Sequence, residues 1–158
     1  MNRPLIIDTN LAILLIVGSI SKGQIKQHKR LGKYDQTDFE ILEEFVVASS
    51  ELIFTPNVLT ETCNLVRQSK EPWKTRFVEV LVTIAQKRKE QIVRSVEAVS
   101  REEYRRLGLT DAGLLYLAKM LNDAVILTDD LLLYLAAAKA GLEAINFTHV
   151  RDQRPDFR

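Results

Sequence analysis

The stretch PLIIDTNLAILLIV, from Pro4 to Val17, decides the fold because it sets one acid between two apolar segments. Leu5 to Asp8 predicts a short interior strand, since the residues before the acid are continuously apolar. Thr9 or Asn10, which follow the acid, can cap a helix over Leu11 to Val17. The stretch therefore predicts a strand that turns directly into a helix, with a carboxylate at the junction.

Length and composition indicate one domain, since 158 residues with 46% hydrophobic side chains supply a single sizeable core. The charges nearly balance, with 22 Lys and Arg against 21 Asp and Glu, so net charge favours neither nucleic acid nor an acidic partner. Any electrostatic binding surface must therefore be local.

The few cysteines and histidines exclude a domain stabilised by disulfides and a domain stabilised by zinc. Cys63 is the only cysteine, so no internal disulfide forms, and two separated histidines do not supply a zinc site. These features favour a reducing cytoplasm. The apolar run Leu11 to Val17 is far shorter than the roughly 20 residues of a membrane span, so we expect a cytoplasmic protein with no membrane partner.

Apolar strand-like segments alternate with amphipathic helices along the chain. The expected strands after the first are Glu51–Thr55, Ile92–Val93, Ala124–Leu127 and Ala144–Phe147. Such alternation predicts an α/β fold, a three-layer α/β/α sandwich with a central parallel sheet. We expect one domain over residues 1–150, with a basic arm at 18–36 and a loose C-terminal tail at 151–158.

Helix-start signals support this order of elements. The spacing of Thr37 and Glu40 is that of a capping box and predicts the start of a helix after the basic arm. Trp73 and Phe77 share an apolar helical face with later residues, which favours the core over a base-stacking role.

Acidic side chains follow the expected strands. Asp8 ends the first strand, and Asp129 and Asp130 stand just beyond Leu127. Asp111 opens a helix, and Glu61 lies in the helix after Thr55. Because ligands of parallel sheets bind beyond the carboxyl ends of the strands, all five carboxylates are expected to converge there.

Each acid also has an ordinary structural explanation. Asp is favoured at helix starts, which would account singly for Asp8, Asp111, Asp129 and Asp130, and an exposed Glu on a helix is common. Helix capping does not require that they all meet at one edge of the sheet. Their joint placement favours a functional site.

Carboxylates brought together repel one another, by about 3 kcal/mol for a pair about 5 Å apart at an effective dielectric of about 20. Protonation offsets this repulsion, and a divalent cation offsets it better. Oxygen ligands without Cys or His select a hard ion such as Mg²⁺ or Mn²⁺. Because such an ion activates water and stabilises charge on phosphate, the pattern predicts hydrolysis of a phosphodiester.

The sequence resembles the PIN-domain family, many of whose members are VapC-type toxin ribonucleases. Four motifs carry the resemblance in order along nearly the whole chain: LIIDTN, FTPNVLTETCNLV, GLTDAGLLYLA and VILTDD. They place the family's acids on Asp8, Glu61, Asp111 and Asp130. Asp129 occupies the variable position of the last motif and is a bystander, a further ligand or a contact of metal-bound water.

The resemblance implies a Mg²⁺- or Mn²⁺-dependent endoribonuclease that leaves a 5′-phosphate and a 3′-hydroxyl. Its catalytic and metal-binding residues would be the four acids, with Asn10 and Thr128 supporting them through hydrogen bonds. It also implies a toxin–antitoxin pair, with an antitoxin protein as partner and a homodimer as a common assembly. The arm at 18–36 is longer than the family's usual connection, which weakens the toxin assignment specifically.

The basic arm offers a contact for RNA. Lys26, Lys29, Arg30 and Lys33 could neutralise phosphates, although a solvated basic loop is the alternative.

Two other functions remain open. A non-catalytic PIN-like module would bind RNA or protein without cutting it. A phosphatase or a phospho-accepting receiver domain would use Asp8, but Asn10 stands where such a phosphatase has a second Asp, and a receiver needs two acids after its first strand.

Overall fold

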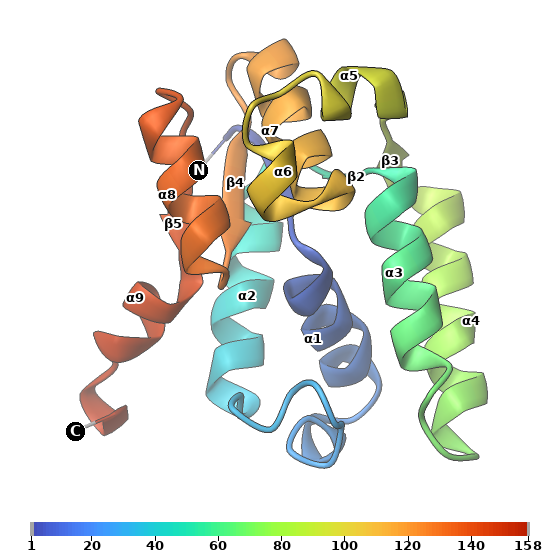
Figure 1. The fold of residues 1–158 in the computed structure, drawn as a ribbon. Coiled ribbons are helices and arrows are strands. Elements are labelled where there is room, and N and C mark those ends of the chain that lie inside the picture. The colour runs from blue at the N-terminus through green and yellow to red at the C-terminus, as the bar shows by residue number, and fades with distance from the viewer. Residues whose placement is uncertain (1, 158) are drawn as a thin grey trace.

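The apolar segment after the N-terminus forms the central strand of a parallel sheet. The protein is described by a computed structural model that covers residues 2–157, with the side chain of Phe157 left out (Figure 1). Its five-stranded sheet has the order β3-β2-β1-β4-β5, and every pairing is parallel. The strands are β1 Pro4–Ile7, β2 Glu51–Phe54, β3 Lys89–Glu90, β4 Val125–Thr128 and β5 Ala144–Asn146.

Helices connect successive strands, as parallel pairing requires. They are α1 Thr9–Ile20, α2 Gln36–Ala48, α3 Pro56–Val66, α4 Trp73–Lys87, α5 Ser95–Val99, α6 Tyr104–Leu107, α7 Leu109–Leu121, α8 Leu131–Lys139 and α9 Phe147–Asp152. Short 3₁₀ turns lie at Lys22–Gln24 and Pro155–Phe157. The expected α/β fold with a central parallel sheet between helices is confirmed.

The chain leaves the central strand β1 toward one edge of the sheet and later returns to build the other. The crossovers from β1 to β2 and from β2 to β3 step one way, while those into β4 and β5 step the opposite way. Right-handed crossovers therefore place α1 to α4 on one face and α7 and α8 on the other. Neighbouring strands β1 and β4 are where the two directions diverge.

The core lies on both faces of the central strands. Leu5, Ile6 and Ile7 are wholly buried, and α1 is buried nearly all round because it packs against α2, α3 and α4. Gly18 permits this packing, since a Cβ there would overlap the ring of Phe39. Helix α1 is thus held rigidly behind the strand that carries Asp8.

Two local expectations differ from the structure. The third strand is Lys89–Glu90, where it pairs with β2, and not Ile92–Val93. Helix α2 begins at a capping box formed by Asp35 and Asp38, and not by Thr37 and Glu40. In each case the actual element lies within three residues of the expected one, because a neighbouring strand or a second acid outweighs the local signal.

The C-terminal segment, expected to be a loose tail, is docked on α2. Arg151 belongs to α9, and its guanidinium donates to the buried Asp38 carboxylate at 2.8 Å. Arg154 donates to the same carboxylate at 2.6 Å and to Asp35 at 3.0 Å. Arg151 also donates to the main-chain carbonyl of Lys33, so this segment fastens the loop between α1 and α2.

No helix within residues 2–157 is long and apolar enough to cross a membrane.

Candidate active site

The Asp8 carboxylate is buried, with 5% of the residue exposed, where β1 turns into α1. One oxygen caps α1 by accepting the Leu11 amide at 2.8 Å. The other accepts the Asp129 amide at 3.0 Å and the Thr128 hydroxyl, both from the end of β4. Burial and then the nearby Asp129 charge raise the pKa of Asp8 to about 7.

These contacts lie where the two crossover directions of the sheet diverge. Asp8 follows β1 and Asp129 follows β4, and these strands are neighbours whose following helices cover opposite faces. This is the position at which open α/β sheets bind ligands. The fold therefore brings the first and last motifs of the sequence to the expected edge.

Asp129 is buried beside Asp8 and has three polar neighbours. Its carboxylate accepts the Asn10 amide at 3.3 Å and the Tyr34 hydroxyl, and it pairs with the Lys33 ammonium. Burial alone would raise the pKa of Asp129, but Lys33 and Tyr34 outweigh it and hold the pKa below its usual value. The negative charge of the Asp129 carboxylate is thus balanced by the Lys33 ammonium and stabilised by the Tyr34 hydroxyl.

Asp111 lies in the first turn of α7 and is half-buried without such compensation. Burial first, and then the charges of Asp130, Glu61 and Asp129 in that order, raise the pKa of Asp111 to about 7. No described residue donates a hydrogen bond to its carboxylate. The N-cap of α7 is Gly108, so Asp111 is not the cap, although an acid in the first turn suits the helix dipole.

Glu61 and Asp130 lie at the exposed margin of the same cluster. Glu61, on α3, accepts the Thr9 hydroxyl at 2.9 Å with one oxygen and the Thr110 hydroxyl with the other. One oxygen of Asp130 caps α8 by accepting the Leu132 amide at 2.7 Å and the Leu133 amide at 3.1 Å. Thr9 follows Asp8 and Thr110 precedes Asp111 in the chain. Their hydrogen bonds therefore link Glu61 to the segments that carry these two acids.

The five acids expected to converge do lie in one electrostatically connected group. Asp129 raises the pKa of both Asp8 and Asp111, and Asp111 is also raised by Glu61 and Asp130. Capping accounts for the contacts of Asp8 and Asp130 but leaves Asp111 and Asp129 unexplained. The group contains oxygen donors only, the set that suits Mg²⁺ or Mn²⁺.

The side chains as they stand do not form a closed metal cage. Within residues 2–157, no three His, Cys, Asp or Glu side chains are arranged so that they could hold a metal ion. The hydrogen bonds of Asp8 and Glu61 and the ion pair of Asp129 occupy the oxygens of these residues. Carboxylate oxygens are the donors that hard cations prefer, but among residues 2–157 the arrangement does not bring three such side chains together.

The expected supporting residues lie where the motifs place them. Thr128 donates to Asp8, and its oxygen accepts the Asp130 amide at 2.9 Å. Asn10 donates to Asp129 and not to one of the four acids implied by the resemblance.

The four residues expected to bind RNA do not lie together in the structure. Lys33 reaches the acids, while Lys29 and Arg30 line a pocket beside α3. Lys26 is exposed on the same loop and is not among the residues that line that pocket. The loop thus extends from the acidic cluster to a separate basic hollow.

Sequence reasoning missed Tyr34, Thr9 and Thr110. Each threonine stands directly beside a motif acid, in DTN and LTD, so the motifs themselves held that signal. Tyr34 had no such signal, because its contact with Asp129 joins residues 95 positions apart and depends on the path of the loop.

Comparison with known proteins adds no identification: no family model matches the chain, and no curated protein matches it.

Proposed function

We propose that the protein is a Mg²⁺- or Mn²⁺-dependent endoribonuclease of the PIN type. The observation that supports this most is Asp111, a half-buried carboxylate without a hydrogen-bond donor and among three other carboxylates. Ionised carboxylates in such an arrangement repel one another, and either protonation of Asp111 or a bound cation relieves that repulsion. Asp111 is not the N-cap of α7, and its place in the first turn is the remaining structural reason for an acid there.

Asp8, Glu61, Asp111 and Asp130 would hold the ion, with Asp129 beside them. The ion, when bound, activates water and stabilises charge on the scissile phosphate. Thr128 and the Asp129 amide hold the Asp8 carboxylate in one orientation. Asn10, Tyr34 and Lys33 hold Asp129. One carboxylate of the set orients or deprotonates the attacking water.

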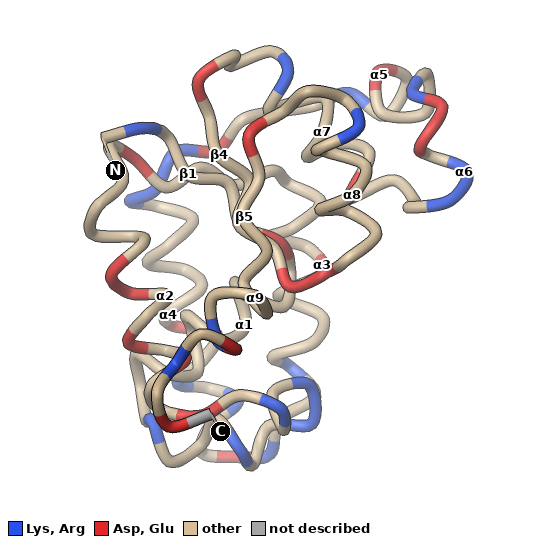
Figure 2. The backbone as a smooth tube through the Cα atoms, turned by 90° about the vertical axis from the view of Figure 1, so that its left-hand side faces the viewer, with Lys and Arg blue, Asp and Glu red and all other residues tan. Residues whose placement is uncertain are grey.

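RNA is the proposed substrate because basic residues extend from the acidic cluster along the loop between α1 and α2. Figure 2 shows Lys and Arg positions gathered at the lower end of the molecule, below the labels of α1 and α4. The finer hypothesis is a toxin whose antitoxin inserts a peptide near the acidic cleft. A cytoplasmic location belongs to the same hypothesis.

A second candidate, a PIN-like module that binds RNA or protein without cutting it, is favoured by one observation. Lys33 already neutralises Asp129, and the acids are not gathered into a cage. The two functions differ in their need for metal. Only the nuclease requires a divalent cation for its activity.

The deciding experiment incubates the purified protein with total RNA, with Mn²⁺ or with EDTA, and sequences the cut ends. The nuclease proposal predicts Mn²⁺-dependent cleavage that Asp8→Asn and Asp111→Asn abolish. Asp123→Asn is the matched control, because this exposed acid precedes β4 at the opposite end of the strand. Cleavage by Asp8→Asn at the parent's rate would overturn the proposal, and absence of cleavage by the parent would favour the binding module.

A further inference from the structure

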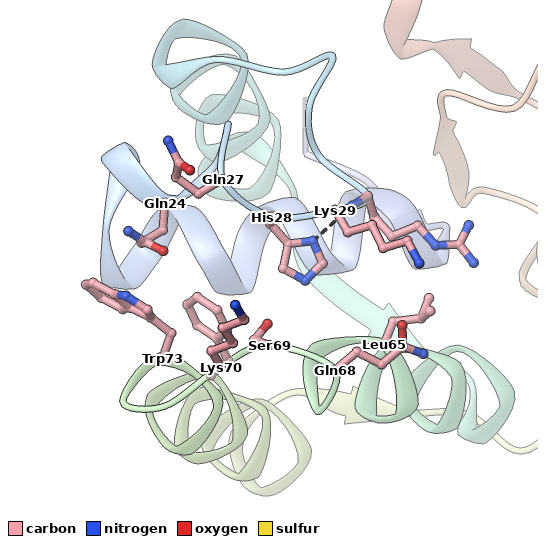
Figure 3. Close-up of a pocket in the computed structure, with 11 residues that line it drawn as sticks. Gln24, Gln27, His28, Lys29, Leu65, Gln68, Ser69, Lys70 and Trp73 are labelled. Carbon is pink, nitrogen blue, oxygen red and sulfur yellow. Dashed lines mark hydrogen bonds between the residues drawn. The ribbon is translucent and has the colours of Figure 1, made fainter.

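A pocket of about 470 Å³ lies between the loop after α1 and the segment that joins α3 to α4 (Figure 3). Its volume falls within the range of about 300–1,000 Å³ that small-molecule ligands occupy. The residues that line it are Gln24, Gln27, His28, Lys29, Arg30, Leu65, Gln68, Ser69, Lys70, Trp73 and Phe77.

The charge of this pocket is of one sign. Lys29, Arg30 and Lys70 line it, and none of its lining residues is acidic. Each of the three cations is exposed. In a chain with a net charge of only +1, this is a local basic site of the kind that holds phosphate groups.

One wall of the pocket is aromatic. The Trp73 and Phe77 rings stack at 6.2 Å between centroids, and the His28 ring meets Phe77 edge-on at 6.4 Å. Phe77 is buried, as the sequence predicts, but Trp73 is half-buried and keeps part of its indole at the pocket. Aromatic rings stack nucleobases with little sequence preference. The Arg76 guanidinium already lies over the Trp73 ring, 5.2 Å from its centroid, so a base meets the part of the indole that Arg76 and Phe77 leave open.

Polar groups in the pocket have unused hydrogen-bonding capacity. The Ser69 hydroxyl is buried and has no hydrogen-bond partner among the described residues. Burial and the charge of Arg30 lower the pKa of His28, and its Nδ1 accepts the Arg30 amide at 3.2 Å. The neutral ring therefore carries its proton on Nε2 as a donor.

The pocket is separate from the acidic cluster, and helix α3 and the loop after α1 connect the two. Glu61, Leu65 and Gln68 are spaced four and three residues apart, so they follow one side of the helix. Leu65 lies one helical turn, about 6 Å, beyond Glu61. The loop makes the same connection, because Lys33 pairs with Asp129 while Lys29 and Arg30 line the pocket.

We propose that this pocket binds one nucleotide of a single-stranded RNA, with the base at Trp73 and His28 and the phosphates at Lys29, Arg30 and Lys70. It would fix the strand beside the carboxylates, a role that rests on the proposed nuclease function. A paired base cannot enter the pocket, so the site selects single-stranded over duplex RNA.

Trp73 provides a direct readout, because it is the only tryptophan in the chain. A short oligouridine is titrated into the protein in EDTA, where no metal-dependent cleavage occurs. Fluorescence anisotropy of the labelled RNA reports binding, and quenching of Trp73 reports occupation of the pocket. We expect both signals to saturate together with single-stranded RNA, and duplex RNA of the same length to leave Trp73 unquenched.

Two substitutions test the assigned contacts. Lys70→Gln should weaken binding and lower the slope of log affinity against log salt by about 0.7, the value for one phosphate contact on a single strand. Ser69→Ala should weaken binding about 2- to 10-fold without lowering protein stability, since the hydroxyl has no partner to lose. Lys119→Gln, an exposed lysine in the last turn of α7, is the matched control and should change neither quantity.

The outcomes separate this proposal from the nuclease function. RNA binding without quenching of Trp73, or with the parent's affinity and salt slope in Lys70→Gln, would overturn the pocket even if Mn²⁺-dependent cleavage is found. Quenching that depends on Lys70 would support the pocket even if no cleavage is found, because the titration contains no metal.

Discussion

The main-chain amide of Asp129 donates a hydrogen bond to the Asp8 carboxylate at 3.0 Å, joining residues 121 positions apart. This contact connects the ends of β1 and β4 and is reinforced by the Thr128 hydroxyl. The position of Asp8 is therefore fixed by the sheet itself and not only by the helix that it caps.

Replacing Thr128 with Val should destabilise the fold and raise the pKa of Asp8 above about 7. Valine keeps the shape of the side chain but removes a donor that favours the ionised carboxylate. We expect the free energy of unfolding to fall by about 1–3 kcal/mol. Urea denaturation measures the loss, and NMR titration of the carboxyl carbon measures the pKa.

Thr62→Val is the matched control for this change. Thr62 is also fully buried, but its hydroxyl has no hydrogen-bond partner among the described residues. The same substitution should therefore leave stability unchanged or raise it. Equal losses at the two positions would show that the Thr128 hydrogen bond contributes nothing of its own.

Stability without metal should depend on pH through Asp8 and Asp111. The fold raises the pKa of each from 3.8 to about 7, so the folded state keeps protons that the unfolded chain releases. The free energy of unfolding should accordingly fall as pH rises from about 4 to about 7. Urea denaturation in EDTA across this range should show the decline.

Asp111→Asn should make that decline shallower and leave only the part due to Asp8, because the neutral amide has no proton to release. Glu44→Gln, at an exposed position on α2, removes one carboxylate without touching the cluster and should leave the parent's slope. A pH profile of Asp111→Asn identical to that of the parent would contradict the raised pKa.

The fold class was predictable because strands and helices leave periodic apolar patterns. Leu5–Ile7 and Val125–Leu127 are continuously apolar and became the two central strands. Strand β3 was misplaced because Lys89 and Glu90 carry no apolar signal and are strand only by pairing with β2. The docked C-terminus was missed because its anchor, Asp38, lies more than a hundred residues away.

The acids of the candidate site could be predicted from the sequence, but the residues that form hydrogen bonds and ion pairs with them could not. Parallel topology alone brings Asp8 and Asp129 to one edge, so strand order sufficed for them. The contacts of Lys33 and Tyr34 with Asp129 depend on a loop path that no periodicity encodes. For the same reason, Trp73 was assigned to the core although it also borders a pocket.

Asp38→Asn should be strongly destabilising. Asp38 is wholly buried and accepts from both Arg151 and Arg154, which would lose their shared carboxylate. Breaking a buried ion pair in this way costs about 3–5 kcal/mol. Asp156→Asn is the control, because this exposed residue also pairs with Arg154 and should cost much less. Thermal and urea denaturation measure both, and similar losses would contradict a structural role for Asp38.

Lys33→Gln should strengthen the binding of Mn²⁺ several-fold. The Lys33 ammonium pairs with Asp129, so it competes with a cation for that carboxylate and lowers the negative potential of the cluster. Lys87→Gln, in the last turn of α4, makes the same charge change away from the acids. Calorimetric titration with Mn²⁺ measures the affinities; weaker binding by Lys33→Gln would show that Lys33 supports the metal site.

The central claim, that the acids at the ends of β1 and β4 share a divalent cation, is tested most directly by measuring bound Mn²⁺ by electron paramagnetic resonance. The account predicts that the parent and Asp123→Asn remove Mn²⁺ from solution, and that Asp8→Asn and Asp111→Asn each do so far more weakly. Absence of binding by the parent, or equal binding by all four proteins, would contradict it.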